Sequence, residues 1–266
     1  MKINKIITLS SLALIGLGAA VPVLADDEYE REYHSNAIVE FIPDEDPTNP
    51  VDPEDPDPNN PVEPWDPTTP ENKPEPGTAG PLSIDFASSL DFGVNKITNK
   101  DETYFANPQY MWNAEHSDFD PSTARPNYVQ ISDKRGTNAG WTLQVKQEGQ
   151  FQNQGTQNKE LHGSQIKLKN GVAASNSTSE APSTSKNIEL DPSGQLSNVM
   201  SAKEGTGSGT WVDKFGSLKE VEVDGKQMLK NTDVELSVPG STPKDAVKYS
   251  TQLTWILTDQ PGNEEY

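Results

Sequence analysis

The stretch Leu82-Ser83-Ile84-Asp85-Phe86 alternates apolar with polar side chains, and Leu90-Asp91-Phe92-Gly93-Val94 repeats the alternation shortly afterwards. Successive side chains of a β-strand point to opposite faces, so this period of two predicts strands that each bury one face. The same pattern returns between turn-forming segments and predicts further strands at residues 128–132, 141–145, 164–168, 195–199, 209–213, 233–238 and 248–257. No long segment carries a helical stripe. The sequence therefore predicts an all-β domain, a β-sandwich or Greek-key-like fold with long loops.

Upstream of these strands, residues 43–80 are rich in aspartate and proline. Proline fixes φ and has no backbone N–H, so this segment is predicted to form neither a helix nor a sheet ladder. Repulsion between its carboxylates extends it further, into a stiff, polyproline-like excursion. Trp65 within it either docks on the domain or stays in solvent. Before it, residues 36–42 are apolar and β-branched and predict a short strand, whereas residues 26–35 are charged and predicted to be flexible.

The first 25 residues have the layout of a secretory signal peptide. Lys2 and Lys5 form a basic end, an apolar run follows, and Val23-Leu24-Ala25 places small residues at a cleavage site. We expect this segment to be removed on secretion. Residues 26–266 contain no other stretch of membrane-spanning length, so we expect no transmembrane span after processing. They also carry no LPxTG-like sorting signal, so we expect retention at the surface to depend on binding.

Acidic side chains outnumber basic ones, with 41 Asp and Glu against 21 Lys and Arg, for a net charge of −20. Eleven of the acidic side chains lie within residues 44–76, together with one lysine. Like charges repel, so nucleic acids and anionic membrane lipids are poor partners for this chain. The chain contains no cysteine, which excludes disulfides and thiolate chemistry and fits a Gram-positive surface protein.

The sequence contains no set of residues typical of catalysis. Its three histidines are widely separated, and the HExxH, GxSxG and phosphate-loop motifs are missing. We therefore expect no enzymatic activity, no catalytic residues, no cofactor and no dedicated metal site. Hard oxygen ligands suit calcium, and conceivable ligands in the acidic loops are Asp133 or the pair Asp118 and Asp120, although no EF-hand spacing is present.

Two Trp-x-Leu motifs stand out, Trp141-Thr142-Leu143 and Trp255-Ile256-Leu257. On a strand, residues two positions apart point to the same face, so each motif places an indole ring beside a leucine. In one interpretation both motifs are packing strands of the core, because Trp is usually buried. In the other, the indole rings lie at the surface and bind a sugar ring or a protein partner. The aromatic-rich stretch 104–112 likewise either covers the core or forms a sticky surface loop.

Together these segments resemble the WxL-domain family of Gram-positive surface proteins. The resemblance rests on the order of several features along the chain. The first are Ile38-Val39-Glu40-Phe41 before the Asp-Pro-rich stretch, Gly80-Pro81-Leu82-Ser83-Ile84-Asp85-Phe86, and Leu90-Asp91-Phe92-Gly93. They are followed by Val129-Gln130-Ile131-Ser132-Asp133-Lys134-Arg135-Gly136, which leads into the first motif, and by the second motif within 253–259. If residues 36–42 are the family's first strand, residues 36–266 form a single domain, and residues 43–80 are an excursion inside it.

The resemblance implies non-covalent attachment to the cell wall, through peptidoglycan or another wall polymer. It also implies association with other WxL-type surface proteins and with a membrane-anchored companion. By position, the candidate binding residues become Trp141, Thr142, Leu143, Trp255, Ile256 and Leu257. Two alternative functions stay open. The chain could be a structural subunit of a multiprotein cell-surface complex, with the Trp-x-Leu motifs in its core, or a glycan-binding adhesin.

Overall fold

The computed structural model describes residues 31–262, and β-strands are the only regular secondary structure within that range. The chain divides into two units, residues 1–40 and 41–266. In the described part of the first unit, residues 31–40, no strand forms and the side chains are exposed. The predicted signal peptide lies outside the described residues. Residues 31–262 contain no helix with the length and hydropathy that a membrane span requires.

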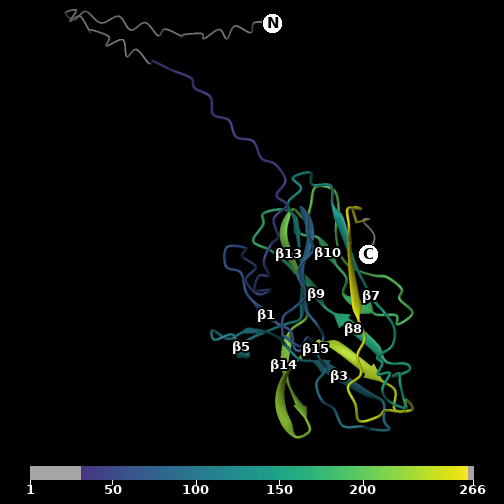
Figure 1. Ribbon diagram of the computed structural model, residues 1–266. Coiled ribbons are helices and arrows are strands. Elements are labelled where there is room, and N and C mark those ends of the chain that lie inside the picture. Colours follow the sequence, from purple (N-terminus) through teal and green to yellow (C-terminus); the bar gives the residue numbers. More distant parts are fainter. Residues whose placement is uncertain (1–30, 263–266) are drawn as a thin grey trace, which may run out of the picture. The chain divides into compact units, whose positions relative to one another are not determined.

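All strands of the second unit pair antiparallel, in four sheets (Figure 1). The first sheet has the order β10 (Ser183–Thr184), β12 (Ser197–Ala202), β7 (Trp141–Gln147), β16 (Leu253–Thr258). The second has the order β2 (Leu82–Ala87), β6 (Tyr128–Asp133), β13 (Gly209–Phe215), β9 (Gly171–Ala174). The third has the order β11 (Asn187–Glu189), β8 (Gln165–Lys169), β15 (Lys226–Val238), β14 (Leu218–Val223), and β3 (Glu102–Ala106) also pairs with β15. The fourth has the order β1 (Pro64–Trp65), β4 (Gln109–Trp112), β5 (Phe119–Arg125).

The prediction of an all-β protein is therefore confirmed, and its sandwich or Greek-key form stays a prediction. Strand β7 shows why periodicity worked here. Its residues alternate strictly between buried and half-buried along Trp141–Gln147, as the sequence pattern predicts for a strand with one covered face. Strand β6 differs, because all of its residues are buried. It lies between β2 and β13, so both of its edges are paired as well.

Two of the predicted strands do not form. Residues 36–42 have no strand partner within the described part of the chain, and Ile38 and Phe41 are 98% and 87% exposed. Residues 90–94 turn instead of extending. The Asp91 carboxylate accepts a hydrogen bond from the Gly93 N–H at 2.9 Å, and Gly93 adopts a φ of 76°, which glycine tolerates because it has no Cβ. An alternating pattern cannot reveal such a turn, because Phe92 is buried in the core in either conformation.

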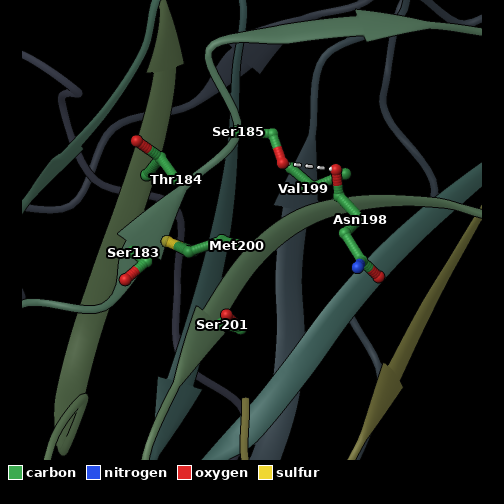
Figure 2. A pocket seen from close by; sticks show the side chains of 7 residues that line it. All are labelled: Ser183, Thr184, Ser185, Asn198, Val199, Met200 and Ser201. Atoms are coloured by element: carbon green, nitrogen blue, oxygen red, sulfur yellow. Dashed lines mark hydrogen bonds between the residues drawn. The ribbon is translucent and has the colours of Figure 1, made fainter. Parts of the chain in front are cut away.

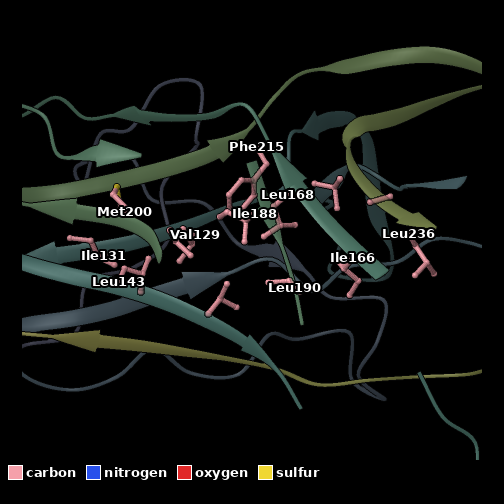
Figure 3. Close-up of a cluster of buried hydrophobic side chains, with 14 of the residues drawn as sticks. Val129, Ile131, Leu143, Ile166, Leu168, Ile188, Leu190, Met200, Phe215 and Leu236 are labelled. Carbon is pink, nitrogen blue, oxygen red and sulfur yellow. The ribbon is translucent and has the colours of Figure 1, made fainter. Parts of the chain in front are cut away.

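The main core brings together side chains from the first three sheets. Figure 3 shows Ile131 of β6, Leu143 of β7, Leu168 of β8 and Met200 of β12 gathered in it, all of them at most 1% exposed. Removing such a side chain from water contributes about 1.5–3 kcal/mol of stability. A smaller cluster contains Val51 with Phe86, Tyr128 and Val212.

The Asp-Pro-rich segment, predicted to be a stiff, extended excursion, makes several contacts with the strands of the domain. Val51 is fully buried, its N–H donates to Gln130 Oε1 at 2.7 Å, and its carbonyl accepts from the Tyr128 hydroxyl at 3.0 Å. Asp52 accepts two hydrogen bonds from the Arg125 guanidinium, at 2.7 and 2.6 Å. The expectation that the segment makes no ladder is wrong for β1, which pairs with β4. Proline is compatible with the first position of a strand at a sheet edge, and β1 begins with one.

Candidate functional site

The first Trp-x-Leu motif lies inside the core. Trp141 and Leu143 have no exposed surface, and they lie on β7, between β12 and β16. The indole N–H of Trp141 donates to the Gly207 carbonyl at 3.0 Å, which satisfies its only polar group. Thr142 points the other way, and its hydroxyl donates to the Gln260 carbonyl at 2.9 Å. This motif therefore packs in the core, and its hydrogen bonds join β7 to the backbone at Gly207 and Gln260.

Gly207 explains how the indole of Trp141 fits. A Cβ at position 207 would lie 2.4 Å from the Ala202 Cβ, closer than real Cβ atoms come to other atoms, and 3.0 Å from Trp141 Nε1, which is a tight contact. Gly207 also adopts a φ of 72°, which strains any residue with a side chain. The glycine lets the backbone approach the indole closely enough to accept its hydrogen bond.

The second motif lies on β16, at the edge of the same sheet. Trp255 and Leu257 pack against the main core but remain partly exposed, and Ile256 is partly exposed on the opposite face. Among the described strands only β7 pairs with β16, which leaves the other side of β16 as an open edge. Such an edge has backbone N–H and C=O groups free to pair with another strand.

The structure brings the two motifs side by side. In the antiparallel register of β7 and β16, Leu257 lies opposite Leu143 and Trp255 lies opposite Val145. The six predicted site residues are thus neighbours, although the two motifs are more than one hundred residues apart in sequence. In this arrangement only the second motif has apolar surface within reach of a ligand. That the motif residues bind a ligand stays a prediction.

Two of the buried carboxylates on the second sheet, Asp85 and Asp213, have raised pKa values. Burial raises the pKa of Asp85, although Ser132, Ser83 and Gln130 all donate hydrogen bonds to its carboxylate. Burial raises the pKa of Asp213 to about 8, against the attraction of the Lys186 ammonium. No side-chain donor reaches either Asp213 oxygen, so its environment favours the neutral acid.

The conceivable calcium ligands make local contacts instead of converging. Asp133 is 3% exposed and binds the Arg135 guanidinium, with its two oxygens at 2.9 and 2.8 Å from Nε and Nη2. Asp118 and Asp120 cap nearby backbone N–H groups of Phe119 and Ser122. Within residues 31–262, no three Asp, Glu, His or Cys side chains gather in a way that could hold a metal ion.

The fourth sheet brings together Trp65, part of the aromatic-rich stretch 104–112 and Phe119, which the sequence did not connect with one another. The aromatic-rich stretch 104–112 divides between two faces, because Gln109 and Met111 are buried whereas Tyr110 and Trp112 are partly exposed. Trp65 and Phe119 lie beside them on β1 and β5. We call the set Trp65, Tyr110, Trp112 and Phe119 the aromatic face. Within residues 109–112, the alternation of side chains was the sequence signal for this face. No sequence pattern linked the partner residues on β1 and β5 to it.

The depressions elsewhere on the second unit are less suited to binding a ligand. A pocket of about 10 Å³ between β10 and β12 holds about one water molecule. Figure 2 shows the hydrogen bond from Ser185 to the Asn198 carbonyl, 2.8 Å long, beside it. Its lining consists of Ser183, Thr184, Ser185, Asn198, Val199, Met200 and Ser201. A wider depression of about 410 Å³ is lined by six polar residues and one proline, without any Trp, Tyr or Phe, namely Gln154, Gln157, Asn158, Lys159, Glu160, His162 and Pro243.

Comparison with known proteins gives one decisive finding. The family model described as WxL domain, surface cell wall-binding, matches residues 28–261, which include both Trp-x-Leu motifs and the Asp-Pro-rich segment. The chain belongs to the WxL-domain family. Nothing among the curated proteins or the solved structures matches it. The match covers nearly the whole chain, so this WxL domain is a cell wall-binding module of the cell surface, in agreement with the resemblance seen in its sequence.

Proposed function

We propose that this protein is a secreted, non-enzymatic WxL protein of a Gram-positive surface that holds onto peptidoglycan without a covalent bond. The observation that carries the proposal is the match of residues 28–261 to a surface cell wall-binding domain. The net charge of −20 supports the choice of polymer. A phosphate-rich, anionic wall polymer would repel a chain of this charge, whereas the glycan backbone of peptidoglycan exposes largely uncharged sugar rings.

The test is sedimentation of purified residues 26–266 with isolated Gram-positive peptidoglycan. One batch of peptidoglycan keeps its anionic polymers, and a second batch is stripped of them. We expect the protein to sediment with both batches, and at least as strongly with the stripped one. Protein that stays in the supernatant with both batches, or that sediments only with the unstripped batch, would contradict peptidoglycan as the ligand.

A second candidate is a structural subunit of a multiprotein cell-surface complex, with other WxL proteins and a membrane-anchored companion as partners. Two observations favour it, the complete burial of Trp141 and Leu143 and the open edge of β16. An unpaired edge strand with partly apolar side chains can accept a strand from another chain.

Ile256→Asp tests this candidate, because a charge in an edge strand discourages strand addition. Ile256→Val is the matched control, since it keeps an apolar, β-branched side chain. Loss of co-elution with purified partner proteins in the first variant alone would support the complex. Equal co-elution of both variants would count against β16 as the contact.

A further inference from the structure

The aromatic face is built by strand register. Trp65 lies opposite Tyr110 in the β1–β4 pair, and Trp112 lies opposite Phe119 in the β4–β5 pair. Directly opposed residues of antiparallel strands share a face, and Tyr110 and Trp112 are two positions apart on one strand. All four rings therefore project from the same face of the fourth sheet. On the other face of β4, Gln109 and Met111 are buried, at 5% and 7% exposed.

Three of the rings contact one another, and the fourth, Trp112, stacks on a histidine. The Phe119 ring centroid lies 4.6 Å from that of Tyr110 and 5.1 Å from that of Trp65. The imidazole of His116 stacks on Trp112, with ring centroids 5.9 Å apart and an interplanar angle of 23°. His116 in turn lies 3.3 Å from a Glu63 carboxylate oxygen. These contacts hold the rings in place before any ligand arrives, which reduces the entropy that binding has to overcome.

The rings lie outside both hydrophobic clusters of the domain, and all four are partly exposed. Their mutual contacts are the ordinary geometry of aromatic pairs and contribute some stability. The four side chains nevertheless leave apolar surface in water on one face of a small sheet, and contiguous apolar surface of this kind is typical of binding sites. All four are aromatic and none is aliphatic. Flat aromatic rings favour ligands that have flat, apolar faces of their own.

The charges around the aromatic face narrow the range of possible ligands. Glu63, Glu115 and Asp118 are exposed in the residues that flank β1 and join β4 to β5. Arg125, at the end of β5, is occupied by Asp52. Carboxylates accept hydrogen bonds from hydroxyl and amide N–H groups, and they repel phosphate, so stacked nucleobases of a nucleic acid and anionic wall polymers are disfavoured.

We propose that the aromatic face binds the sugar rings of an uncharged amino-sugar glycan, as found in the glycan strand of peptidoglycan. The rings stack on the apolar faces of the sugars, and Glu63 and its neighbours accept hydrogen bonds from hydroxyl and acetamido groups. This inference rests on the proposed function and deepens it, because it places the glycan contact on the fourth sheet instead of on the Trp-x-Leu motifs.

The test uses the whole processed chain, residues 26–266, and a soluble oligomer of N-acetylglucosamine as the probe. Resonances of the indole N–H groups are followed by NMR during titration. We expect the Trp65 and Trp112 signals to shift and the Trp255 signal to stay unchanged. A shift of Trp255 without Trp65 or Trp112 would overturn the proposal in favour of the second motif. The same shifts on addition of a proline-rich peptide, with none on addition of the oligomer, would overturn it in favour of a protein ligand.

Sedimentation with stripped peptidoglycan then tests the aromatic face separately from the proposed function on which this proposal rests. We expect Trp112→Ala to weaken binding about tenfold or more, as truncation of an aromatic contact residue does. Trp112→Phe keeps a stacking ring and should retain most of the binding. Tyr33→Ala, which removes a 93% exposed aromatic side chain outside the aromatic face, is the control. Circular dichroism and the melting temperature report whether each variant is folded.

The outcomes are distinguishable. Wild-type protein that binds while a folded Trp112→Ala variant binds equally well overturns the aromatic face and leaves the proposed function intact. Wild-type protein that does not bind peptidoglycan overturns the proposed function itself. If Trp112→Ala fails to fold, the NMR titration of the wild type still decides, because it does not depend on that variant.

Discussion

At the scale of single residues, the two tryptophans of the Trp-x-Leu motifs have different environments. Trp141 is completely buried and hydrogen-bonded to Gly207, whereas Trp255 lies on an edge strand and keeps part of its ring in solvent. One motif is therefore structural in this fold, and the other combines packing with exposure. Because the same three-letter pattern occupies both environments, the motif itself does not indicate what its tryptophan does.

Replacement of each tryptophan by alanine should expose this difference. Trp141→Ala removes a fully buried ring and should destabilise the protein by about 3–5 kcal/mol, the range for large aromatic side chains in cores. Trp255→Ala should cost clearly less, because part of that ring is already in water. Urea denaturation of the two variants and the wild type measures both effects. Equal losses would show that Trp255 is as important to the core as Trp141.

Asp213 gives a prediction for pH dependence. Burial raises its pKa in the folded protein to about 8, above the usual value of 3.8. Between these two values the folded state binds a proton that the unfolded state has released, so stability falls as the pH rises from about 4 to about 8. Asp213→Asn keeps the shape of the neutral acid and should remove this slope.

The variant should therefore be more stable than the wild type at pH 8 and similar to it at pH 4. A rise in melting temperature of about 10 °C or more at pH 8 is the expected size, since a pKa difference of about four units corresponds to about 5 kcal/mol and each kcal/mol is worth about 2–4 °C in a domain this large. Melting curves over the pH range provide the measurement. Parallel pH profiles for the two proteins would mean that Asp213 is ionised at pH 7 in the folded state.

At the scale of elements, the Asp-Pro-rich segment shows how a proline-rich chain can be held on a sheet. Val51 donates its N–H to Gln130 of β6, and the carbonyls of Val51 and Asn49 accept hydrogen bonds from Tyr128 and Gln130 of the same strand. The Asp52–Arg125 pair fixes it further along. Burial is the largest single influence on Asp52 and opposes its ionisation. The hydrogen bonds from Arg125 and from the Glu54 N–H, together with the charges of Arg125 and Lys214, outweigh burial and lower the pKa of this carboxyl group.

Asp52→Asn should loosen the segment without unfolding the domain. A neutral amide cannot form the charged, two-pronged bond that Arg125 makes with the carboxylate, and such bonds are stronger than neutral ones. We expect faster cleavage within residues 43–80 under limited proteolysis, together with a small drop in melting temperature. Glu45→Gln, an exposed change in the same segment, serves as the control. Identical cleavage rates for both variants would rule out a clamping role for Asp52.

Because the pKa of Asp52 is lowered in the folded state, acid should have the same effect on the wild type. The stabilisation is present above the unfolded pKa and is lost as the pH falls through the folded value, which lies below 3.8.

At the scale of the whole molecule, net charge and binding mode are linked. The chain has a net charge of −20, and the proposed contact with peptidoglycan depends on ring stacking and hydrogen bonds. At 0.1 M salt, the interaction between exposed charges more than about 10 Å apart is largely screened, whereas ring stacking is largely unchanged. Binding to stripped peptidoglycan should therefore weaken little, or strengthen slightly, between low and high salt in sedimentation assays. A steep loss of binding with salt would point instead to attraction between charged groups as the main contact.

The order of segments along the chain was enough to determine the all-β class and the family. Period-two alternation survives in β7 because one covered face leaves its mark on every second residue. In β2 the polar Ser83 and Asp85 are buried while Leu82 and Ile84 are half-buried, and the register shifts between Ile84 and Phe86. Alternation failed at residues 90–94, where the Gly93 N–H donates to the Asp91 carboxylate and no strand forms, and at 36–42, where no partner strand is present in the described structure.

Only the tertiary structure decided which of these faces are buried. Periodicity shows that Trp141 and Leu143 share a face, but the Gly207 carbonyl and the strands around β7 are what enclose it. The aromatic face likewise needs Trp65 and Phe119, which are more than fifty residues apart, to pair with opposite sides of β4. A single sequence determines the pattern within each strand, whereas burial and ligand contact depend on which distant strands pair, and that follows from the free energy of the whole fold.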